Sequence, residues 1–160
     1  MRRSSLRRAG ALALGLLISV SLLYGISRLI ALAERNNCRS NLSALGYAIF
    51  SYSHKEACYP STPNDLIPRY MVSRVFLMCP AVDDHKKDVP NGTDWGDFTY
   101  INWPNNFDVP EREYREYPQL YDCAFSNHGG RGINILRIGG DVLWDPGATW
   151  LKNFAASHPE

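Results

Sequence analysis

The feature that most constrains this 160-residue chain is an uncharged, mostly apolar run from Ala9 to Ser27. A helix needs about 20 apolar residues to cross the hydrocarbon core of a bilayer, and this run is close to that length. Four arginines precede it, namely Arg2, Arg3, Arg7 and Arg8, whereas the first acidic residue is Glu34. Basic residues on one flank keep that flank in the cytoplasm. We therefore expect the chain beyond Arg28 to lie outside the cytoplasm.

Two fates of residues 1–35 are compatible with this start. A secretory signal peptide would be cut after the small-x-small sequence that ends at Ala33. A retained signal anchor accounts better for the length of the run and for Arg28, whose side chain reaches the headgroups from the helix end. We expect retention. Residues 1–35 then form a cytoplasmic basic leader and one transmembrane helix of the inner membrane, and residues 36–160 form a head in the periplasm or outside.

Small residues recur every four positions within the run, at Ala11, Gly15 and Ser19. They share one face of the expected helix, and small residues at this spacing let two membrane helices approach closely. Small residues are also common in membrane segments that do not associate. We take this face as the membrane and assembly surface of the helix.

The segment after the run carries an amphipathic helical pattern. Its apolar residues follow a four-three-four-three spacing, at Cys38, Leu42, Leu45, Ile49 and Tyr52. Such spacing places them on one face of a helix. Because no proline follows before Pro60, we expect one continuous helix from about Ala9 to about His54. Its second part, residues 36–55, should pack on the β head, residues 56–160.

The remainder predicts a small antiparallel sheet. The expected strands are residues 75–78, 98–103, 120–125, 133–138 and 141–144, and a short helix is expected within residues 147–157. Gly139 and Gly140 link two strands, and a two-residue Gly-Gly link is typical of a hairpin in which both residues adopt positive φ. The predicted fold class is α+β, with a long N-terminal helix on an antiparallel sheet.

Four cysteines fall on the expected outer side of the membrane, at Cys38, Cys58, Cys79 and Cys123. An even count in an oxidising compartment predicts up to two disulfides, with three pairings open. Zinc is the weaker alternative, because there is no Cys-x-x-Cys pair and the histidines His54, His85 and His128 are scattered.

The charge of the head argues against nucleic-acid binding. From Asn36 onward the chain has 11 Lys and Arg against 15 Asp and Glu, and 11 − 15 gives −4. Nucleic-acid binding would require clustered basic residues. Calcium is a minor alternative to an absence of cofactors, because Asp83, Asp84, Asp94 and Asp97 sit in polar loops.

Several short segments, in this order, resemble one known family. They are Cys38–Gly46 (Cys-x-x-Asn-Leu-x-x-Leu-Gly), Tyr59–Ser61, Asp65–Pro68, Val75–Pro80, Asn127–Gly130, Gly132–Leu136 and Gly140–Trp144. The chain is similar to pilin-like proteins, or pseudopilins, that have a prepilin-type N-terminus and a C-terminal His-Gly-Gly…Asp-Gly element. The resemblance implies a type IV pilin-like fold.

The chain departs from that family at two places. Members begin with a prepilin peptidase site, a Gly followed by Phe-Thr-Leu-Ile-Glu, but Gly10 here is followed by Ala11 and Leu12 and no Glu. The peptidase site is thus degenerate. Gly139-Gly140 stands where the family has Asp-Gly, which favours turn geometry over chemistry, so we do not expect His128 to be catalytic.

The resemblance implies a membrane-anchored structural or accessory subunit of a type II secretion or type IV pilus-like assembly. Its partners would be the membrane and other pilin-like subunits, and it would not be an enzyme. The alternative is a solitary tethered module that never assembles and binds a ligand through the polar loops of residues 83–96 and 104–118.

Overall fold

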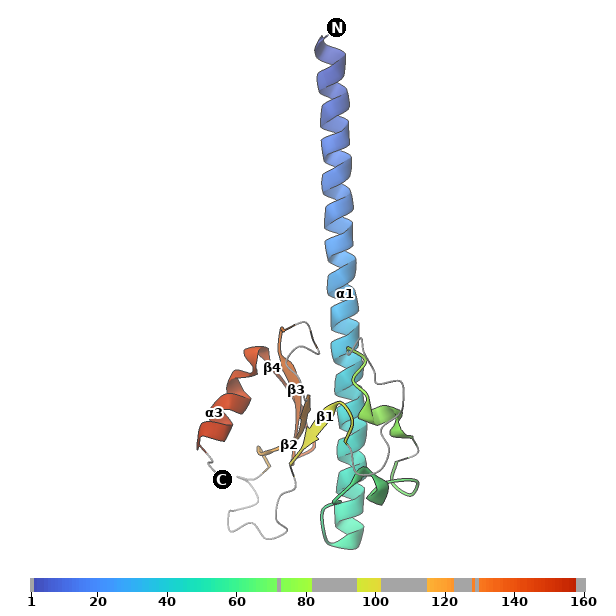
Figure 1. Cartoon of the computed structure of the whole chain (residues 1–160), viewed down its shortest axis with the longest axis vertical. Coiled ribbons are helices and arrows are strands. Elements are labelled where there is room, and N and C mark those ends of the chain that lie inside the picture. The colour runs from blue at the N-terminus through green and yellow to red at the C-terminus, as the bar shows by residue number, and fades with distance from the viewer. Residues whose placement is uncertain are drawn as a thin grey trace. The chain divides into compact units, whose positions relative to one another are not determined.

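A computed structural model describes residues 2–71, 73–81, 95–101, 115–122, 128 and 130–157 (Figure 1). The chain divides into two compact units, Met1–Ala33 and Glu34–Glu160. The described elements comprise one long helix, a four-stranded antiparallel sheet and a short C-terminal helix. The predicted α+β class is confirmed.

Helix α1 runs without a break from Arg2 to Glu56, two residues beyond the expected end and seven before the expected start. Among the described residues, this is the one helix long and apolar enough to cross a membrane, a property that a signal sequence shares. Its most apolar 18-residue window has a mean hydropathy of 2.0, and none of that window is buried. This window therefore exposes an apolar surface, as a helix in lipid does.

The part of α1 that belongs to the second unit is amphipathic. Cys38, Leu42, Leu45 and Ile49 are fully buried, and Tyr52 is partly buried against the same core. Tyr47 and Phe50 are exposed on another face. The apolar stripe expected from the sequence is thus the face that this helix buries.

The sheet has the strand order β1-β2-β3-β4, in which all neighbours are antiparallel. Its strands are β1 (Phe98–Tyr100), β2 (Pro118–Asp122), β3 (Ile133–Arg137) and β4 (Val142–Asp145). Consecutive strands pair in chain order, so the sheet is a simple meander. The expected positions 102–103 and 123–125 lie outside the described residues.

The two faces of the sheet pack against two helices. Leu120 and its pairing partner Leu136 belong to the core that contains the buried stripe of α1. Ile133 and Ile135 alternate with Leu136 and pack with Trp150 and Leu151 of helix α3, Thr149–Ser157. Successive strand residues point to opposite faces, which places the sheet between α1 and α3.

The strand expected at residues 75–78 is wrong. Arg74–Leu77 form a short 3-10 helix, η2, and Val75 is exposed. The Oγ of Ser73 accepts a hydrogen bond from the Val75 amide at 3.2 Å, which is the N-cap interaction that starts a helical turn. The apolar run therefore forms a helical turn and not the expected strand, because the serine before it caps that turn.

The β3–β4 turn also differs from the expected two-residue link. Leu136 pairs with Val142, and the Arg137 amide donates to the Asp141 carbonyl at 3.0 Å. The loop therefore has three residues, Ile138 to Gly140. Gly140 has a φ of +87° and Gly139 is not among the residues with positive φ. This is the arrangement of a three-residue hairpin loop closed by a left-handed glycine.

Candidate functional site

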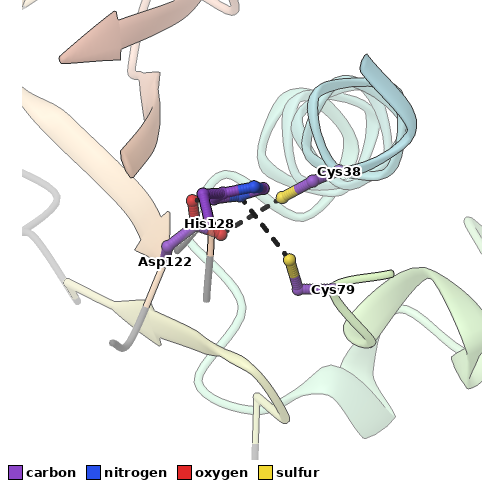
Figure 2. Close-up of side chains that lie close together, drawn as sticks. All are labelled: Cys38, Cys79, Asp122 and His128. Atoms are coloured by element: carbon purple, nitrogen blue, oxygen red, sulfur yellow. Dashed lines mark hydrogen bonds and ion pairs between the residues drawn. The ribbon is translucent and has the colours of Figure 1, made fainter. Parts of the chain in front are cut away.

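Four buried side chains with metal-binding or nucleophilic atoms meet in the second unit: Cys38, Cys79, Asp122 and His128. Their Sγ, carboxylate O and imidazole N atoms all lie within 4.8 Å of one another. Figure 2 shows the four side chains pointing toward a common point from separate parts of the chain. We call this set the Cys-Cys-Asp-His cluster.

Cys38 and Cys79 are brought together by hydrogen bonds that fix the segment after η2. The Nδ2 of Asn41 on α1 donates to the carbonyl of Met78 at 2.9 Å. The amide of Cys79 donates to Oδ2 of Asp97 at 2.7 Å. These bonds hold Cys79 beside the helix, where its Sγ lies 3.4 Å from that of Cys38.

Asp122 ends β2 and connects the sheet to the cluster. Its Oδ1 accepts from the Cys38 thiol at 3.1 Å, and its Oδ2 accepts from the amide of Asn134 at 2.7 Å. Oδ2 also lies 3.0 Å from Nε2 of His128. Both side chains of this pair are almost wholly buried, at 3% exposure for His128 and 0% for Asp122.

The imidazole of His128 lies close to Cys79 and to side chains of β3 and β4. Its Nε2 lies 3.7 Å from Sγ of Cys79 and 3.3 Å from Nδ2 of Asn134. The ring of Trp144 meets the imidazole edge-on, with centroids 5.4 Å apart. Oδ1 of Asn134 is buried and has no hydrogen-bond partner among the described residues.

The members of the cluster shift one another's pKa values. The hydrogen bond with Cys38 lowers the pKa of Cys79 to about 6, against the opposing effect of burial and with a further hydrogen bond from His128. Burial acts to lower the pKa of His128, but the hydrogen bonds with Asp122 and Cys79 outweigh it and raise that pKa to about 9. The pKa of Cys38 is raised by its hydrogen bond with Cys79 and by burial. Cys79 is thus the thiol that ionises first, facing a histidine that favours its charged form.

The disulfide prediction is wrong for the described cysteines. Cys38, Cys58 and Cys79 are free thiols. The 3.4 Å between Sγ of Cys38 and Sγ of Cys79 exceeds the roughly 2.05 Å of a disulfide bond. Cys123 lies outside the described residues.

The expected membrane face and hairpin turn lie elsewhere. The Ser19 hydroxyl donates to the carbonyl of Gly15 at 2.9 Å within α1, and the side chain of Ala11 is outside the described residues. Gly139 and Gly140 line a surface hollow of about 510 Å³ beside Tyr47 and Phe50. No member of the Cys-Cys-Asp-His cluster lines it.

The alternatives based on polar loops fall mostly outside the described residues. This holds for Asp83, Asp84 and Asp94, proposed for calcium, and for most of residues 83–96 and 104–118. Asp97 is described, and its carboxylate is engaged by the Cys79 amide.

The cluster has no signature at short spacing in the sequence. Cys38 and Asp122 are 84 residues apart, and Cys79 and His128 are 49 apart. One signal was present: Cys38, Cys79 and His128 each lie in a segment that carries the resemblance to pilin-like proteins. Asp122 had no signal of its own.

Comparisons with protein-family models, curated proteins and solved structures find no match for this chain. The architecture itself is pilin-like, with a long apolar N-terminal helix whose later part packs on a four-stranded antiparallel sheet.

Proposed function

We propose that this protein is a membrane-anchored, pilin-like subunit with a structural or accessory role in a type II secretion or type IV pilus-like assembly. The observation that carries the proposal is α1. One uninterrupted helix, Arg2–Glu56, contains both a lipid-compatible apolar segment and the amphipathic stripe on which the β head is built. A domain that is soluble throughout would not expose such an apolar segment to water. An anchor that only tethers a domain would not continue as a helix of that domain's core.

The described chemistry fits a structural role. The four members of the Cys-Cys-Asp-His cluster are all buried. A catalytic group must reach its substrate, whereas these side chains face one another inside the fold. The proposal therefore assigns the protein no reaction.

The membrane segment offers a surface for a second copy. A Cβ placed on Gly15 would meet nothing within 4 Å, so this face of α1 is open. The Ser19 hydroxyl donates to the Gly15 carbonyl, so this hydroxyl is already paired within the helix. Two such helices can approach closely and gain van der Waals contact without exposing polar groups to lipid.

Cysteine crosslinking in native membranes tests this assembly. We expect the Gly15→Cys variant to give a disulfide-linked dimer on mild oxidation. The matched control is Leu17→Cys, because position 17 lies about 200° around the helix from position 15. The unsubstituted chain measures any contribution of the native cysteines.

A dimer from Gly15→Cys that clearly exceeds both controls supports the subunit proposal. Equal yields at positions 15 and 17, or no dimer from either variant, would favour a solitary tethered module.

A further inference from the structure

We propose that Cys38, Cys79, Asp122 and His128 bind a structural zinc ion that fastens helix α1 to the β head. This proposal is independent of the proposed function, because an ion here would stabilise the fold whatever the protein does. Its members come from α1, the segment after η2, the end of β2 and the segment before β3. One ion would therefore join parts of the head that are distant in sequence.

The donor set selects the metal. Two thiolates, one imidazole and one carboxylate are ligands typical of zinc, whereas calcium and magnesium require oxygen ligands. Because thiolates are soft ligands, this cluster also does not suit a hard cation such as calcium, which was considered for the polar loops. Zinc has no redox chemistry of its own and suits a site whose role is structural.

Two of the separations between donor atoms are close to the edges of a tetrahedral zinc site. With zinc–sulfur bonds of about 2.3 Å and zinc–nitrogen bonds of about 2.0 Å, the edges of a tetrahedron are about 3.8 Å between two sulfurs and about 3.5 Å between sulfur and nitrogen. The corresponding distances are 3.4 Å for Cys38–Cys79 and 3.7 Å for Cys79–His128. Because the four donor atoms span up to 4.8 Å, the longest separation would shorten by about 1 Å for all four to coordinate one ion.

Four protein ligands leave no position for water or substrate. Catalytic zinc sites keep one position open, whereas structural sites are closed. Counted over the whole residue, Cys38 and Cys79 have no solvent exposure, and Asp122 and His128 are 2% and 8% exposed. The closed, buried set therefore points to stability and not to catalysis.

The surroundings supply outer hydrogen bonds of the kind that orient metal ligands. The amide of Asn134 holds Oδ2 of Asp122, and a hydrogen bond from the backbone of Ala81 favours the Cys79 thiolate. Trp144 packs against the imidazole of His128. These contacts would orient the ligands around a bound ion.

Zinc also resolves the electrostatics of the cluster. Binding releases the thiol protons and requires neutral Nε2 on His128. Two thiolates and one carboxylate then face a dication, which neutralises most of their charge in a site that excludes water. A Cys38–Cys79 disulfide would instead consume both thiols. Asp122 and His128 would then remain buried with no thiolate ligand beside them.

Metal content of the purified full-length chain provides the first test. We expect protein extracted in detergent under reducing conditions to contain about one equivalent of zinc by elemental mass spectrometry. Cys79→Ser should lose most of this zinc. Cys58→Ser is the matched control, because Cys58 is a free thiol outside the cluster, and it should retain the wild-type content.

Cobalt(II) exchange covers the case in which Cys79→Ser does not fold. The wild-type chain, stripped with a chelator and supplied with cobalt(II) alone, should show thiolate-to-cobalt charge-transfer absorption and the visible bands of a tetrahedral site. Zinc added afterwards should remove both.

Two results would overturn the proposal. One is a wild-type chain with no zinc that also gives no tetrahedral cobalt spectrum. The other is a Cys38–Cys79 disulfide, found by non-reducing peptide mapping in protein from native membranes.

Discussion

A Cβ atom added to Gly46 would lie 2.8 Å from Cδ1 of Leu136, so α1 and β3 meet at a position where the helix has room only for glycine. Leu136 is fully buried and cannot swing into solvent. This contact sets how closely the helix approaches the sheet.

Gly46→Ala should therefore lower the free energy of unfolding by about 1 kcal/mol, although alanine favours helix more than glycine does. Urea unfolding of the detergent-solubilised protein measures the change. Gly25→Ala is the control, because a Cβ there meets nothing within 4 Å, and it should not destabilise the head. Equal effects from both changes would contradict the close packing.

The buried stripe of α1 should carry much of the stability of the head. Leu45 is fully buried, so Leu45→Ala should cost about 2–5 kcal/mol through lost burial and the cavity left behind. Tyr47 is 74% exposed on the same turn, and Tyr47→Ala should change stability by less than about 0.5 kcal/mol. The same urea experiment compares the two variants, and a similar cost at both positions would refute the assigned helix face.

Asp145 caps helix α3. Its Oδ1 accepts from the Thr149 amide and its Oδ2 from the Leu151 amide, both at 3.0 Å. Asp145→Ala should cost about 1–2 kcal/mol, because two amides at the helix start lose their partner. Asp141 forms an exposed pair with Arg137, so Asp141→Ala should cost less than about 1 kcal/mol. If thermal unfolding ranks the two in the opposite order, the capping role is wrong.

Much of this fold could be predicted from the sequence, and the reason is periodicity. The spacing from Cys38 to Tyr52 is helical, and the alternation around Ile135 suits a strand with two packed faces. These patterns depend only on which residue is apolar. They therefore gave the α+β class, the long helix and the four strands β1 to β4.

The cluster could not be predicted in this way, because it depends on strand register and on single hydrogen bonds. Asp122 meets Cys38 because the end of β2 lies beside α1, a contact between residues 84 positions apart. Cys79 is positioned by Asn41 and Asp97, which no periodic pattern identifies as its partners. The helical turn at η2 is likewise decided by one residue, Ser73.

The hydroxyl oxygen of Tyr100 is buried with no hydrogen-bond partner among the described residues, and the ring stacks on Trp95 with centroids 4.1 Å apart. Tyr100→Phe keeps the stack and removes the unpaired hydroxyl. It should raise the free energy of unfolding by about 1 kcal/mol at neutral pH.

The same variant should change the response to alkali. Burial, with the nearby Tyr59, raises the pKa of Tyr100 above its usual value of about 10. Because the unfolded-state phenol ionises at a lower pH, the stability of the wild-type chain is unaffected by Tyr100 below about pH 10 and falls as the pH rises through the folded-state pKa. The advantage of Tyr100→Phe should therefore grow above pH 10 in urea titrations at several pH values. A constant difference would contradict the raised pKa.

The mass of the mature protein shows whether α1 is retained, which anchoring and assembly both require. Intact-mass measurement of the membrane-extracted protein should show either the full 18.1 kDa chain or a product that begins at Ala11. A mature chain that begins at Glu34 and is recovered in the soluble fraction would contradict the account, since the apolar run would then be a cleaved signal sequence.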